Sequence, residues 1–143
     1  MKNFILIGLV IISLFSCASN KGTETVDKTA PQVYEHAITN DKPHYKITLL
    51  WLADTINDSR SSIEFKDEDM QIIKGTVAIP TIMYPKWFDY TIRITETTIT
   101  MSCSNFRQGT EKVPIFTTGE YNSFKKDTAA FAVSLFDYLD TFQ

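Results

Sequence analysis

The sequence lacks most residue patterns that mark catalytic or metal-binding sites. Its 143 residues include two histidines, His36 and His44, and neither pairs with a cysteine at zinc-like spacing, so no metal site is expected. Its five glycines form no phosphate-binding loop and no dinucleotide fingerprint, so no nucleotide cofactor is expected. No serine lies in a Gly-x-Ser-x-Gly elbow, the motif of a hydrolase nucleophile. The acidic run 67–69 lacks the glycine and distal glutamate of a calcium loop, and is interpreted as a solvated turn.

The sequence also lacks an excess of positive charge. It carries 14 basic and 17 acidic side chains, a formal net charge of −3. Proteins that grip nucleic acid usually carry a strongly basic domain or face, so nucleic acid is not an expected partner. After residue 15 no apolar stretch is long enough to cross a bilayer, and the folded part is therefore expected outside the hydrocarbon.

The N-terminus carries one clear pattern. Lys2 precedes an almost unbroken apolar run, Phe4 to Phe15, and Leu14-Phe15-Ser16 then leads to Cys17. A basic start, a short apolar segment and a small residue before a cysteine are typical of a bacterial lipoprotein signal. This interpretation makes 1–16 a signal peptide, Cys17 the lipidated residue and 17–31 a flexible tether. An ordinary secretory peptide, in which Cys17 is merely nearby, is the alternative.

The segment after Cys17 bears on location. It has no acidic residue directly after the cysteine and no evident acidic export cluster. The expected location is the cell envelope, anchored by lipid in the outer membrane and facing the periplasm. Lipidation of Cys17 would leave Cys103 without a disulfide partner. Because Cys103 alternates with Ile99 and Met101, it is expected to be a buried structural thiol.

Hydrophobic periodicity predicts one α+β domain over 32–143. Apolar residues three and four apart indicate two helices, and alternation of apolar and polar residues indicates two antiparallel hairpins. The first helix, with Asn40 or Asp41 as its cap and Pro43 in its first turn, should bury Tyr45, Leu49, Leu52, Ala53 and Ile56. The second, capped by Asp127, should bury Phe131, Leu135, Tyr138 and Phe142. The expected strands are 32–38, 61–66, 73–79, 88–94 and 99–103, with a short edge strand at 113–116, and the expected helices end near 57 and 141.

The order strand, helix, two hairpins, helix favours a single antiparallel sheet of about five strands. Both helices have one apolar side, so the simplest arrangement packs them on the same face of that sheet.

The helix and first hairpin resemble a known family. Trp51-Leu52-Ala53-Asp54-Thr55, Ile63-Glu64-Phe65-Lys66-Asp67 and Ile72-Ile73-Lys74-Gly75 are similar to segments of uncharacterised secreted proteins and lipoproteins of Bacteroidetes-type bacteria. That family is described as a domain of unknown function with a TATA-binding-protein-like (TBP-like) fold. The resemblance, over about 33–105, implies a helix-backed curved sheet and no activity. Gly75 matches a family position, and is interpreted as a strand kink or a close approach of the helix to the sheet.

Two surfaces are candidates for binding a partner. The first is the sheet face away from the helices, where the alternation places hydroxyls, charges of both signs and no aromatic side chain. The second is the loop 80–87, which is unusually apolar for a connection. A wet sheet face, or a loop that folds back and buries Trp87, would account for these features without binding. The candidate residues are Lys74, Thr91, Arg93, Thr100 and Ser102 on the sheet face, and Ile82, Met83, Tyr84 and Trp87 in the loop.

The sequence therefore predicts an envelope lipoprotein whose domain binds or scaffolds an envelope protein, a peptide or a glycan, without catalysis, cofactor or metal. A small envelope hydrolase with an unrecognised site and a purely structural envelope component are the alternatives. The hydrolase would require a concave pocket in which titratable groups converge.

Overall fold

The computed structural model describes residues 27–56, 58–115 and 117–142. The signal peptide, Cys17 and most of the tether predicted from the sequence lie outside these residues. Two helices and six strands follow one another in the order β1-α1-β2-β3-β4-β5-β6-α2. Their bounds are β1 Gln32–Ala37, α1 His44–Thr55, β2 Ser62–Asp67, β3 Ile72–Ile79, β4 Lys86–Ile94, β5 Thr98–Gln108, β6 Val113–Pro114 and α2 Thr118–Thr141.

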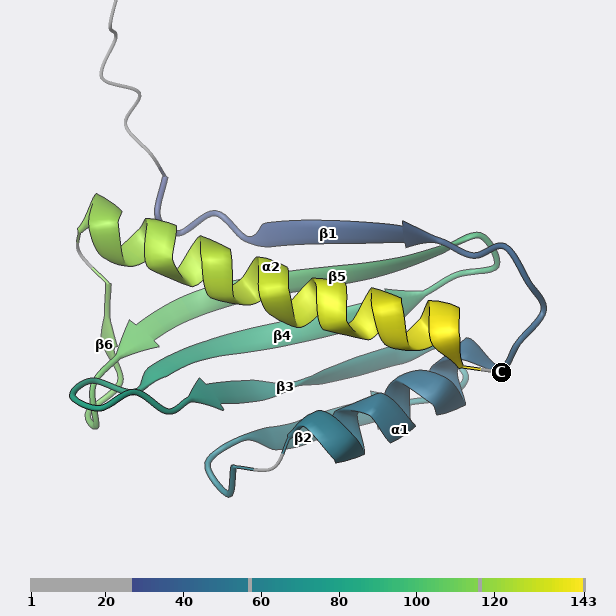
Figure 1. Ribbon diagram of the computed structural model, residues 1–143, viewed down its shortest axis with the longest axis horizontal. Coiled ribbons are helices and arrows are strands. Elements are labelled where there is room, and N and C mark those ends of the chain that lie inside the picture. The colour runs from purple at the N-terminus through teal and green to yellow at the C-terminus, as the bar shows by residue number, and fades with distance from the viewer. Residues whose placement is uncertain (1–26, 57, 116, 143) are drawn as a thin grey trace, which may run out of the picture.

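All strands belong to one antiparallel sheet with the order β1-β5-β4-β3-β2, and β6 pairs with the end of β5. Both helices lie on the same face of the sheet, α2 along its length and α1 beside β2 and β3 (Figure 1). This arrangement confirms the predicted α+β class and the packing of both helices on one face. No helix in the described part of the chain is long and apolar enough to cross a membrane.

The core lies between the sheet and the two helices. The alternation in β4 and β5 directs their apolar residues toward the helices, and aromatic rings fill the space between. Phe88 contacts Phe131 edge-on, with ring centroids 5.6 Å apart, and Phe106 packs against Phe124 at 5.4 Å. Cys103 is completely buried in this core, and burial raises the pKa of its thiol to about 12.

Helix α2 begins nine residues earlier than the sequence suggested. Thr117, not Asp127, is its N-cap: the Thr117 hydroxyl accepts from the Glu120 backbone N–H, and the Glu120 carboxylate accepts from the Thr117 backbone N–H. This reciprocal capping box, Thr-x-x-Glu, satisfies two N–H groups that a helix otherwise leaves unpaired. Asp127 instead sits inside the helix, where its carboxylate pairs with Lys86 of β4.

The buried side of α1 also differs from the predicted stripe. Ala53 is exposed and Leu49 is only partly buried, because the helix is rotated relative to the expectation. The residue before the helix, Pro43, occupies the N-cap position, so neither Asn40 nor Asp41 caps it. The buried positions repeat at three and four residues: His44, Tyr45, Ile47, Thr48, Trp51 and Leu52.

Strand β2 departs from the simple alternation at Glu64. Its register against β3 shifts between Ile63, which pairs with Gly75, and Phe65, which pairs with Lys74. One extra residue in a strand turns the following side chains to the opposite face. Phe65 therefore lies on the face away from the helices, and Lys66 on the helix side, the reverse of the prediction.

Gly75 lies where two parts of the sheet approach closely. A Cβ atom at this position would meet the Ser62 carbonyl oxygen at 2.0 Å and the Tyr90 hydroxyl at 2.6 Å. The close approach expected from the sequence is therefore present, but it is made by β2 and a β4 side chain and not by a helix.

Candidate functional site

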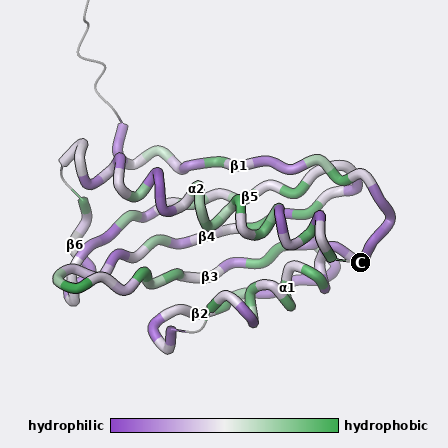
Figure 2. Tube along the Cα trace, viewed as in Figure 1, coloured by the Kyte–Doolittle hydropathy of each residue, from purple (hydrophilic) through white to green (hydrophobic). Residues whose placement is uncertain are grey.

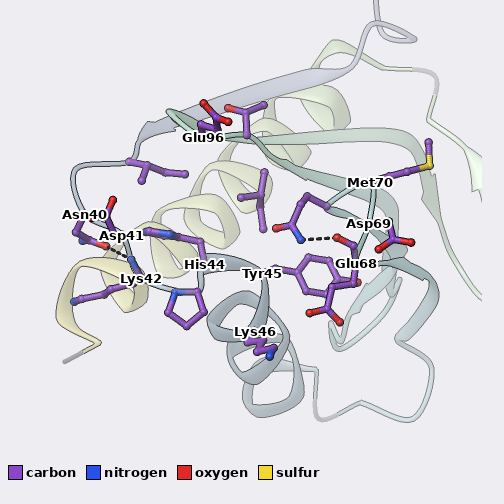
Figure 3. Close-up of a pocket in the computed structure, with 15 residues that line it drawn as sticks. Asn40, Asp41, Lys42, His44, Tyr45, Lys46, Glu68, Asp69, Met70 and Glu96 are labelled. Atoms are coloured by element: carbon purple, nitrogen blue, oxygen red, sulfur yellow. Dashed lines mark hydrogen bonds between the residues drawn. The ribbon is translucent and has the colours of Figure 1, made fainter.

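A pocket lies at the end of the sheet where β1 finishes and α1 begins (Figure 3). It has a volume of about 870 Å³. Four segments distant in sequence form its walls: the β1–α1 connection, the first turn of α1, the β2–β3 turn and the β4–β5 turn. Volumes of this size are typical of small-molecule and peptide sites.

One wall of the pocket is built by the N-terminus of α1. This helix has no side-chain cap and no acidic residue in its first turn. The His44 backbone N–H donates to the Lys42 carbonyl oxygen at 2.8 Å, which leaves the N–H groups of Tyr45 and Lys46, with the partial positive charge of the helix end, for an anion. Lys42 and Lys46 flank the turn. The Lys42 ammonium donates to the Phe142 carbonyl oxygen, which fixes this wall against the end of α2.

His44 points into the pocket from the first turn of α1 (Figure 3). Its exposed fraction is only 9%, yet in the described part of the chain neither ring nitrogen has a hydrogen-bond partner. Among the described residues, the one side-chain polar atom that is both fully buried and without a hydrogen-bond partner is Thr48 Oγ1. The two unpaired ring nitrogens of His44 therefore keep some contact with the pocket space. A mostly buried ring whose free polar atoms reach a cavity is poised to bond a ligand there.

The opposite wall is acidic. Glu68 and Asp69 come from the β2–β3 turn, and the ring of Tyr45 points toward them across the pocket (Figure 3). Burial, and secondarily the negative charges of Glu68 and Asp67, raise the pKa of Tyr45. The turn is held by Gln71, whose side-chain amide donates to the Glu68 carbonyl oxygen at 2.5 Å.

The pocket is therefore lined by charges of both signs: Lys42 and Lys46, with Asp41 beside them, at the start of α1, and Glu68 and Asp69 on the β2–β3 turn. Glu96 adds a third acidic position on the β4–β5 turn. The sequence did not identify this site. From the sequence, His44 is considered only as a zinc ligand, and 67–69 only as a calcium loop or a solvated turn. The one local signal is that the helix follows Pro43 and has no acidic residue in its first turn, which indicates an uncapped N-terminus. That signal does not predict which turns of the chain lie opposite the helix end.

The loop between β3 and β4, predicted as a partner contact, is only partly exposed. Ile82 is fully exposed, and Met83 and Tyr84 expose 75% and 56% of their surfaces. Trp87 is 5% exposed and is not available for contact, which corrects the prediction for that residue. In Figure 2 the tip of this loop carries the hydrophobic colour that otherwise marks stretches of the strands and helices. A groove of about 450 Å³ beside Met83 and Tyr84 continues toward the β5–β6 turn.

Trp87 is buried on the sheet face away from the helices because two cations cover it. The Lys112 ammonium lies 4.2 Å from the centre of the indole ring, and the Arg60 guanidinium 5.8 Å from it. Its ring N–H donates to the Gly109 carbonyl oxygen at 3.1 Å. These contacts attach the base of the β3–β4 loop to the β5–β6 turn.

The candidate residues on the open sheet face lie in two rows across the strands. Lys74, Thr91 and Ser102 are register partners in one row, and Arg93 and Thr100 in the next. The first row also includes Phe65, which is 45% exposed and has the Lys74 ammonium 5.7 Å from its ring centre. The expectation that this face has no aromatic side chain is therefore wrong, because the β2 bulge was not foreseen.

A ladder of polar contacts crosses the same face nearer the buried tryptophan. The Asp89 carboxylate accepts from Arg107 and from the Asn105 side-chain amide, the latter at 2.6 Å. The Thr76 hydroxyl lies 2.9 Å from Asp89 and 2.8 Å from Glu64. Since these side chains satisfy one another, this part of the face is a structural network and offers few free polar groups to a ligand.

Residues 27–56, 58–115 and 117–142 contain no group of three metal-ligating side chains. His36 is fixed on the helix side of the sheet, stacked on Phe136 with ring centroids 5.0 Å apart and with its Nε2 3.1 Å from Asp140. It therefore takes no part in the pocket.

Two solved structures share this architecture. One is a DUF4468 family protein from Bacteroides ovatus, with 13% sequence identity and a TM-score of 0.57 over 80% of this chain and 86% of that chain. The other is a TBP-like protein from Parabacteroides distasonis, with 9% identity and a TM-score of 0.63 over 82% of this chain and 96% of that chain.

The fold is TBP-like. This confirms, at the level of fold, the resemblance to a domain of unknown function found in Bacteroidetes-type bacteria. At these identities the likeness concerns the fold alone, and fold does not determine function. No family model and no curated protein matches the sequence.

Proposed function

We propose that the chain is a lipid-anchored protein of the bacterial cell envelope whose TBP-like domain binds a short peptide without catalysing a reaction. The anchor is inferred from the signal-like pattern that ends at Cys17. The outer membrane, facing the periplasm, is the proposed location. The observation that supports binding is the pocket of about 870 Å³, which is lined by charges of both signs and includes the N-terminus of α1 on one side and Glu68 and Asp69 on another.

A peptide with free ends matches these charges of both signs. Its carboxylate would accept hydrogen bonds from the uncapped N-terminus of α1 and from His44, as anions do at helix N-termini. Its ammonium group would lie against Glu68 and Asp69 on the facing turn. Ile38, Pro43 and Ile94 line the same pocket and offer apolar contacts to side chains.

We propose binding without catalysis because no serine or cysteine nucleophile paired with a base lines the pocket among the described residues. A hydrolase of this kind needs a nucleophile hydrogen-bonded to a base, and the described residues of the pocket include no serine and no cysteine. His44 is not hydrogen-bonded to Asp41, Glu68 or Glu96. The titratable groups are therefore better placed to hold charges than to transfer protons.

Calorimetric titration of the mature protein with trialanine tests the proposal. We expect binding that is lost when both ends of the peptide are blocked, as in acetyl-trialanine amide. The variants Glu68→Gln and His44→Phe should each weaken binding about tenfold, because a hydrogen bond to a charged group contributes about 1.5–3 kcal/mol and 1.4 kcal/mol is a factor of ten. Glu111→Gln, at the other end of the sheet, is the matched control and should bind normally.

Two results would contradict the proposal. One is the absence of any trialanine binding to the unaltered protein. The other is equal binding of the free and blocked peptides, which would show that the charged walls do not recognise the ends.

A further inference from the structure

The tip of the β3–β4 loop presents three consecutive apolar side chains to solvent: Ile82, Met83 and Tyr84. The loop that carries them is held at its base. The Gly109 backbone N–H donates to the Pro85 carbonyl oxygen at 2.9 Å, and the Trp87 ring N–H donates to the Gly109 carbonyl oxygen. At the tip itself, the Tyr84 N–H donates to the Thr81 hydroxyl at 3.1 Å. The exposed residues are thus displayed from a fixed position and have no core of their own to cover.

This tip lies at the end of the sheet where the described chain begins. Strand β1 starts there, and the β3–β4 loop and β6 lie at the same end, whereas the pocket lies at the other (Figure 1). Three strand spacings separate β1 from β3 in the order β1-β5-β4-β3, or about 14 Å. Between Cys17 and Asp27 the chain has ten steps, and a flexible coil of that length spans about 17 Å. An anchor at Cys17 therefore holds the tip within reach of the bilayer surface.

We propose that Ile82, Met83 and Tyr84 insert into the lipid surface to which the chain is anchored. The inference rests on the proposed anchor at Cys17. A lipid surface is favoured over a protein partner because the end of the domain at which the chain enters from the proposed anchor lies beside the tip, and because all three apolar side chains of the tip are exposed by more than half. With the tether and the tip both at the membrane, the domain loses its freedom to tumble. The charged pocket at the opposite end then points away from the lipid.

The experiment uses the lipidated mature protein reconstituted into phosphatidylcholine vesicles. A bimane fluorophore is attached at Met83→Cys, and at Glu96→Cys as the matched control on the β4–β5 turn at the pocket end. Cys103 is fully buried and will not compete for the label. With phosphatidylcholine brominated in its acyl chains, bimane at position 83 should lose at least half of its fluorescence, whereas bimane at position 96 should be unchanged.

The outcomes separate the tip from the anchor. If the protein floats with the vesicles but positions 83 and 96 are quenched equally, the proposal for the tip is wrong and the anchor stands. If the unaltered protein does not float, or Cys17→Ser floats equally well, the anchor is wrong and the tip proposal fails with it. A change in the fluorescence of bimane at position 83 with protein concentration, in the absence of vesicles, would show that the tip contacts a second copy of the chain. If Met83→Cys is protected from labelling in native envelopes but not in phosphatidylcholine vesicles, the tip contacts a protein partner. Either result overturns the proposal.

Discussion

Replacing Gly75 by alanine should remove a large part of the free energy of unfolding of the domain. The added Cβ would lie 2.0 Å from the Ser62 carbonyl oxygen and 2.6 Å from the Tyr90 hydroxyl, distances that no carbon–oxygen contact tolerates. The Ser62 oxygen is a backbone atom of β2, and the Tyr90 side chain is 2% exposed in the core. Neither the Ser62 oxygen nor the Tyr90 hydroxyl can therefore move away without loss of packing. Overpacking of a filled site usually costs about 1–3 kcal/mol, and a clash with backbone belongs at the upper end.

We therefore expect Gly75→Ala to lower the free energy of unfolding by about 3 kcal/mol, and the melting temperature by more than about 10 °C. Urea and thermal unfolding of the purified mature protein, followed by circular dichroism, measure both quantities. Gly119→Ala is the matched control, because the nearest atom to its new Cβ is the Thr117 hydroxyl at 3.9 Å, an ordinary contact. The double variant with Tyr90→Phe should recover only a minor part, since the clash with Ser62 remains. A loss below about 0.5 kcal/mol for Gly75→Ala would refute the reasoning.

Two further predictions concern the core thiol and the start of α2. Burial raises the pKa of Cys103 to about 12. Above pH 9 the unfolded chain therefore releases a thiol proton that the folded chain keeps, and the free energy of unfolding should fall by up to about 1.4 kcal/mol per pH unit. Urea unfolding between pH 8.5 and 10 should show this slope, and Cys103→Ala should flatten it; an unchanged slope would contradict the assignment. Thr117→Ala removes the capping box and should cost about 1 kcal/mol in the same assay, whereas Thr118→Ala, one residue inside the helix, should cost much less.

The strands of the second hairpin were predictable because their pattern is local and redundant. Phe88, Tyr90 and Ile92 alternate with polar residues, and β5 repeats the alternation. A shift of one residue would move every one of these side chains to the wrong face, so the pattern determines the register as well as the strand. The same reasoning gave the burial of Cys103 correctly.

The first hairpin shows where that reasoning stops. Ile63 and Phe65 satisfy the alternation as well as any pair in the chain, yet the bulge at Glu64 puts them on opposite faces. The cause lies elsewhere in the sequence. Gly75 lets the Tyr90 side chain and the Ser62 carbonyl approach each other across β3, where a larger residue would keep them apart. No window that contains only β2 carries that information.

The start of α2 was missed for a different reason. Gly119 and Pro114 interrupt the helical pattern before Asp127, so the local sequence favours the later start. The signal for the true start was present in Thr117 and Glu120, which have the spacing of a capping box. A glycine in the first turn of a helix weakens it only modestly, and Phe124 and Tyr121 compensate by packing into the core. Tertiary burial therefore extends the helix across residues whose local preference is poor.

The pocket could not be predicted, because it depends on connectivity and not on any one segment. In an antiparallel sheet entered at β1, every second connection falls at the same end. The β1–α1 connection and the β2–β3 and β4–β5 turns therefore meet at one end, while the β3–β4 loop and the entry of the chain share the other. The residues that line the pocket extend from Ile38 to Glu96, and no sequence motif links them. The same topology separates the pocket from the N-terminal side of the domain by the length of the strands. The proposed anchor before β1 would thus leave the charged pocket on the side of the domain away from the lipid, because the order of the strands determines where the pocket lies.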